Sequence, residues 1–129
     1  MNNFEEMKPV DILLVEDSPG DADLAKEALE DSKLKNNLFT VVDGEAALDF
    51  LYKRAPYENV PRPDLILLDL NLPKKDGREV LKEIKEHPEL KRIPVVVLTT
   101  SRAEEDILKT YNLHANCYIA KPLDLDKFL

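Results

Sequence analysis

Five short apolar segments are spaced along the chain, with amphipathic stretches between them. They are Val10–Val15, Phe39–Val42, Asp64–Leu68, Pro94–Leu98 and Asn116–Ile119. The first, third and fourth are nearly continuous apolar runs without alternation, which is typical of parallel strands covered on both faces. The pattern therefore predicts five β-strands in one largely buried sheet.

The stretches between these segments carry helix signals. After the first strand, Ser18 and Pro19 suit an N-cap and the first helical position. The apolar face predicted for this helix consists of Leu24, Ala25, Ala28 and Leu29. A second helix is predicted after Asp43, with its apolar face at Ala47, Leu48 and Leu51.

Capping-box spacings predict two more helices. Asp76 with Glu79 precedes Val80, Leu81 and Ile84, and Ser101 with Glu104 precedes Ile107, Leu108 and Tyr111. Strands that alternate with helices imply an α/β fold, in which a parallel sheet carries helices on both faces through right-handed crossovers.

Two regions depart from this alternation. Tyr52–Pro63 contains three prolines, which predicts a stiff extended loop. After Lys121 and Pro122 only seven residues remain, so the last helix is expected to be short or truncated.

Composition narrows the possible functions. The 129 residues suit one domain, and 18 basic against 26 acidic residues give a net charge of −8. Such a chain is a poor binder of nucleic acid or anionic lipid. No apolar run approaches the ~20 residues that span a membrane. From the charge and the short apolar runs, we expect no nucleic-acid or membrane partner. The single cysteine, Cys117, excludes an intrachain disulfide, and we expect a cytoplasmic location.

Polar residues follow the predicted strands where each strand ends. Glu16 and Asp17 follow the first, Asp69 the third, Thr99 the fourth and Lys121 the fifth. The carboxyl ends of parallel strands lie along one edge of the sheet, where ligands bind, so these residues should converge. Each alone has an ordinary explanation, as a solvated cap or a surface lysine, and only the combination is specific.

The chemistry of this set favours phosphoryl transfer. Three neighbouring carboxylates repel one another, and a divalent cation relieves the repulsion. All-oxygen ligands favour Mg²⁺. Lys121 and Thr99 supply a cation and a hydroxyl donor, as the charge on a transferring phosphoryl group requires. Asp69 is then the nucleophile that forms an acyl phosphate.

These residues lie in motifs that resemble a known family. The motifs are Asp11–Asp17, Leu67–Pro73, Asp76–Gly77, Val97–Ser101 and Tyr118–Pro122. Together they resemble the CheY-like receiver domain of two-component response regulators, over about residues 9–126. The resemblance implies a flavodoxin-like, doubly wound five-stranded parallel sheet of order 2-1-3-4-5, in a single domain over residues 1–129.

The resemblance also implies roles at the acidic cluster. Asp69 would accept a phosphoryl group from a sensor histidine kinase or a phosphotransfer protein. Glu16 and Asp17 match the acidic pair that holds Mg²⁺, Glu16 through water, and Asn71 matches the position whose main-chain carbonyl completes the metal shell. Lys74 and Lys75, close to Asp69 in sequence, are expected to add local positive potential.

Further roles follow for the last two strands. Thr99 and Lys121 match residues that contact phosphoryl oxygens, and Thr100 matches a small residue that leaves room for the group. Thr99 and Tyr118 match the hydroxyl and aromatic pair that reorients on activation. The resemblance therefore predicts a phosphorylation-dependent switch that catalyses only its own phosphorylation and autodephosphorylation.

Partners are predicted at a finer level. The proline-containing loop, Leu98–Ser101 and Leu113–Tyr118 resemble single-domain regulators of phytochrome-type histidine kinases. A shortened C-terminus would leave an apolar groove on the sheet. We therefore expect a homodimer through the face formed by the fourth helix, the fifth strand and the fifth helix.

Two alternatives remain from the residues alone. The first is a Mg²⁺-dependent aspartyl-phosphate hydrolase of small phosphates, although Asn71 stands where such an enzyme needs a second carboxylate as general acid. The second is a receiver-like interaction domain that is never phosphorylated.

Overall fold

The computed structural model describes residues 8–99 and 117–120. In chain order its elements are β1 (Val10–Val15), α1 (Pro19–Asp31), β2 (Asn36–Val41), α2 (Gly44–Leu51), β3 (Leu65–Asp69), α3 (Gly77–Glu86), a 3₁₀ turn η2 (Leu90–Arg92), β4 (Val95–Thr99) and β5 (Cys117–Ala120). The helix predicted after Ser101 and the predicted last helix lie outside the described residues.

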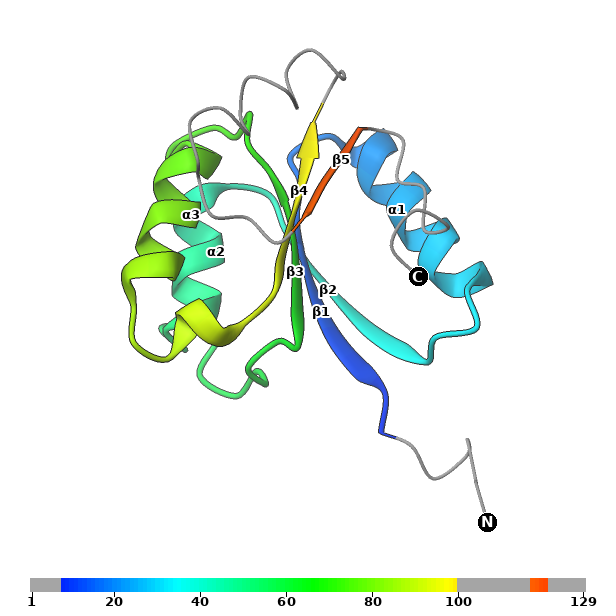
Figure 1. Ribbon diagram of the computed structural model, residues 1–129, viewed down its shortest axis with the longest axis horizontal. Helices are drawn as coiled ribbons and strands as arrows, with labels where there is room; N and C mark the ends of the chain where they lie inside the picture. Colours follow the sequence, from blue (N-terminus) through cyan, green and yellow to red (C-terminus); the bar gives the residue numbers. More distant parts are fainter. Residues whose placement is uncertain (1–7, 100–116, 121–129) are drawn as a thin grey trace.

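All five strands form one parallel sheet. Their order is β2-β1-β3-β4-β5, which confirms the predicted topology. In Figure 1 α1 covers one face of the sheet, and α2 and α3 cover the other. Val15 pairs with Val41 and Leu68, and Asp69 pairs with Leu98, so the carboxyl ends of the strands share one edge.

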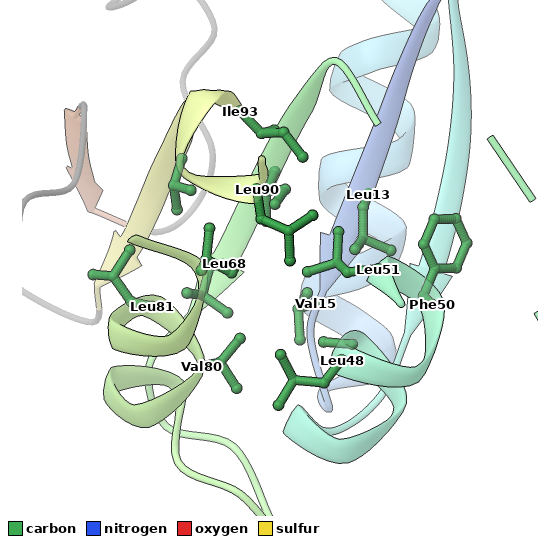
Figure 2. Packing of buried hydrophobic residues seen from close by; sticks show 14 of the residues in the cluster. Leu13, Val15, Leu48, Phe50, Leu51, Leu68, Val80, Leu81, Leu90 and Ile93 are labelled. Carbon is green, nitrogen blue, oxygen red and sulfur yellow. The ribbon is translucent and has the colours of Figure 1, made fainter. Parts of the chain in front are cut away.

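Burial on both faces explains the unbroken apolar strands. Leu13 and Val15 of β1 pack with α2 and α3, as Figure 2 shows, whereas Ile12 and Leu14 pack on the α1 side. Since successive side chains of a strand point to opposite faces, a strand between two helical layers needs apolar residues at every position.

The structure corrects the predicted apolar face of α1. Ala25 and Leu29 are buried, but Leu24 is 49% exposed. Successive residues of a helix are rotated by about 100°, so Leu24 lies beside the buried stripe. The start of β2 was also predicted three residues late, because Asn36 already pairs with Val10 despite its polar side chain.

The segment from Tyr52 to Pro63 is a loop, as predicted, but turns interrupt it over residues 52–59, and only residues 60–63 are free of turns. The Tyr57 N–H donates to the Arg54 carbonyl at 2.7 Å. The Tyr57 ring then packs 5.4 Å from that of Phe50, centroid to centroid. Aromatic contact with the core therefore folds the loop back. Among the described helices, none is long and apolar enough to cross a membrane.

Candidate functional site

Two adjacent strands bring three carboxylates together. Glu16 and Asp17 directly follow β1, and Asp69 is the last residue of β3. Carboxylate oxygens of the three residues lie within 4.8 Å of one another. The predicted convergence of these three side chains therefore holds in the structure.

Burial makes this cluster unusual. Glu16 is 2% and Asp69 3% exposed, whereas Asp17 faces solvent. Glu16 Oε2 accepts from the Ser18 N–H at 3.3 Å, and Asp69 Oδ1 accepts from the Asn71 N–H at 3.0 Å. Main-chain donors thus orient both buried carboxylates. The all-oxygen donor set and its crowded negative charge fit a hard divalent cation.

The start of α3 packs against the backbone of Asp69. A Cβ atom on Gly77 would lie 2.5 Å from the Asp69 carbonyl oxygen and 2.5 Å from Leu70 Cα. Asp76 caps the helix as predicted, although its Oδ1 accepts from the N–H of Arg78 at 2.7 Å and not from that of Glu79, as a capping box requires. Glycine is needed here because the helix begins so close to Asp69.

The remaining predicted residues belong to β4, β5 and the segments after them. Thr99 ends β4 and pairs with Ala120, and Tyr118 of β5 pairs with Val97. This pairing places Thr99 next to the carboxyl end of β3, and Tyr118 one strand further along the sheet. Thr100 and Lys121 lie outside the described residues.

The two lysines after β3 are engaged with carboxylates. Lys74 Nζ lies 3.6 Å from Asp43 Oδ2, and Lys75 Nζ lies 2.9 Å from Glu83 Oε2. The hydrogen bond to Glu83 raises the pKa of Lys75, and the same bond lowers the pKa of Glu83. The expected local positive potential is therefore largely compensated. Sequence reasoning missed these carboxylates because only the fold brings them to the loop.

Comparison with known proteins decides the family. Residues 12–129 match the family of response regulator receiver domains. The chain belongs to this family. It is the receiver domain of a two-component response regulator, with the CheY-like fold that the sequence predicted.

Individual relatives are similar over most of their length. The response regulator Rcp1 of Synechocystis sp. is 58% identical over 121 residues, which cover 94% of this chain and 82% of Rcp1. The crystal structure of the Mn²⁺-bound form of Rcp1 has a TM-score of 0.80 at 58% identity, covering 92% of this chain and 86% of that one. The structure of the phosphorylated cyanobacterial phytochrome response regulator RcpA has a TM-score of 0.80 at 55% identity, with coverage of 93% and 86%.

Proposed function

We propose that this receiver domain, spanning residues 1–129 with a core at about 9–126, is a cytoplasmic phosphoacceptor switch in which Asp69 carries the phosphoryl group. The observation that carries the proposal is the buried Asp69 carboxylate at the end of β3, within 4.8 Å of Glu16 and Asp17. The phosphorylated relative RcpA supports it.

Asp69 acts as the nucleophile. One of its carboxylate oxygens attacks the phosphorus of a phosphohistidine, an O–P bond forms, and the N–P bond to the imidazole breaks. The Asn71 N–H holds Oδ1 in place at 3.0 Å, so the carboxylate is oriented before the donor arrives. The domain then catalyses only its own phosphorylation and autodephosphorylation.

The carboxylates of Glu16, Asp17 and Asp69 and the main-chain carbonyl of Asn71 are proposed to hold Mg²⁺. Their all-oxygen chemistry and the Mn²⁺-bound Rcp1 structure support a divalent ion. When bound, the ion stabilises negative charge on the phosphoryl oxygens.

Thr99, Thr100 and Lys121 are proposed to contact the phosphoryl group, and Thr99 with Tyr118 to couple it to a protein-binding surface. The support is topological: β4 lies next to β3, and β5 lies next to β4. A hydroxyl drawn towards the phosphoryl group at the end of β4 would leave space beside β5, which Tyr118 can fill.

The proposed phosphodonor is a sensor histidine kinase or a phosphotransfer protein. A phytochrome-type kinase is supported by the similarity to RcpA. A net charge of −8 argues against nucleic acid and membrane surfaces as partners.

A homodimer through the face of helix 4, strand 5 and helix 5 is also proposed. Sedimentation velocity that shows monomer alone, with and without phosphorylation, would argue against it.

Labelling with acetyl phosphate and Mg²⁺ tests the phosphoacceptor. Asp69→Asn should abolish incorporation, because an amide oxygen does not form a stable acyl phosphate. Asp64→Asn is the matched control, since Asp64 directly precedes β3, at its opposite end, and an amide oxygen can still accept from the Asp11 N–H. Undiminished labelling of Asp69→Asn would overturn the proposal.

A further inference from the structure

Glu83 connects the loop after β3 to the end of α2. Lys75 donates to Glu83 Oε2 at 2.9 Å, and the Tyr52 hydroxyl donates to Glu83 Oε1 at 3.0 Å. Lys75 belongs to the loop Leu70–Asp76, and Tyr52 is the C-cap of α2. Both oxygens of one α3 carboxylate are thus engaged, one by the loop and the other by a neighbouring helix.

The first turn of α2 holds the same loop from a second side. Asp43 caps α2 by accepting from the Ala46 N–H at 2.7 Å, and its other oxygen faces Lys74 Nζ at 3.6 Å. A Cβ atom on Gly44 would collide with the Lys75 carbonyl oxygen. The loop therefore lies directly against the helix backbone.

A short, constrained segment connects these contacts to the acidic cluster. Only Leu72, Pro73 and Lys74 separate Asn71 from Lys75. The Leu72 side chain packs against the buried core, and the Lys75 N–H donates to the Pro73 carbonyl at 2.8 Å. Because this segment is short and constrained, a displacement of Lys75 is transmitted to Asn71.

We propose that Lys75, Glu83 and Tyr52 are positioning residues that set the Asn71 main-chain carbonyl for metal binding; this inference rests on the proposed metal site. Partners outside the ligand set fix the orientation of the ligands and thereby the affinity. Burial, followed by the bond to Glu83, raises the pKa of Tyr52.

Calorimetric titration with Mn²⁺, then Mg²⁺, tests this on Lys75→Met, Glu83→Ala and Tyr52→Phe. Each variant should bind the metal more weakly, by about tenfold for the first two, at the lower end of outer-partner effects. Charge alone predicts opposite signs, because losing a lysine near a cation site tightens binding and losing a glutamate weakens it. Weaker binding by both variants is therefore specific to positioning.

Arg62→Met is the matched control. It breaks a different ion pair, with 3.0 Å between Arg62 Nη1 and Glu89 Oε2. Arg62 lies just before β3 starts and hence at the opposite end of the strand from Asp69. The metal affinity of Arg62→Met should equal that of wild type. Glu83→Gln should recover part of the metal affinity that Glu83→Ala loses. Circular dichroism selects a temperature at which every variant is folded.

The outcomes separate this inference from the proposed function. If wild type binds the metal but Lys75→Met binds it equally or more tightly, the positioning role is overturned and the metal site stands. If wild type binds neither Mn²⁺ nor Mg²⁺, both proposals are overturned.

Discussion

At the scale of single residues, Gly77 is the tightest point beside Asp69. No larger residue fits, because any Cβ would meet the backbone of Asp69 and Leu70 at 2.5 Å. The start of α3 can therefore approach the end of β3 only through glycine.

Gly77→Ala should consequently lower the free energy of unfolding by about 1–3 kcal/mol, the usual cost of overpacking. Urea denaturation measures it. Gly20→Ala is the control: Gly20 lies in α1 with nothing within 4 Å of a Cβ, so the same substitution should stabilise the protein by up to about 1 kcal/mol. Equal effects at both glycines would contradict the close approach seen at Gly77.

At the scale of elements, α1 shows the limit of periodicity arguments. The helix, its cap at Ser18 and its buried Ala25 and Leu29 follow from the sequence. The exposure of Leu24 does not, because Leu24 and Leu29 look equally suitable for burial until the position of the sheet is known.

Two leucines of α1 therefore make a matched pair. Leu29→Ala removes a side chain that is 2% exposed and should lower the free energy of unfolding by about 2–5 kcal/mol. Leu24→Ala truncates one that is 49% exposed and should change it by less than about 0.5 kcal/mol. Urea melts of both variants measure the contrast, and a large loss at Leu24 would contradict the observed packing.

The same limit applies to the site. The carboxylates at strand ends could be predicted because parallel topology alone brings Glu16, Asp17 and Asp69 to one edge. The contact between Lys75 and Glu83 could not, since it depends on how the loop folds onto α3. Tyr52 is 31 positions from Glu83 in sequence, and only the packing of α2 beside α3 makes them neighbours.

At the scale of the whole molecule, the proposed metal site would link metal binding to folding. Three neighbouring carboxylates disfavour the folded state unless a cation compensates them. A cation that binds the folded chain alone stabilises it by mass action.

Mg²⁺ at one hundred times its dissociation constant should raise the free energy of unfolding by about 2.7 kcal/mol. Asp17→Asn should lose most of this gain while remaining at least as stable as wild type without metal, because Asp17 is exposed and its charge adds to the repulsion. Urea melts with Mg²⁺ and with a chelator measure both quantities. An equal Mg²⁺ gain in Asp17→Asn would remove this residue from the metal site.

Because β1 is buried on both faces, the residues at its two ends determine the register in which it pairs with its neighbours. Because Ile12–Val15 are apolar throughout, moving the strand along by one residue would still bury hydrophobic side chains within that stretch. The polar residues at the two ends of β1 disfavour such a shift. At the start, the Asp11 N–H donates to the Asp64 carboxylate, and the Asp64 N–H donates to the Asp11 carbonyl. At the end, the Glu16 N–H donates to the Val41 carbonyl and extends the pairing with β2. Such a shift would bury Asp11 in place of Ile12. The acidic residues that we assign to phosphoryl chemistry therefore also mark where the strand must stop, and the function and the alignment of this strand cannot be changed independently.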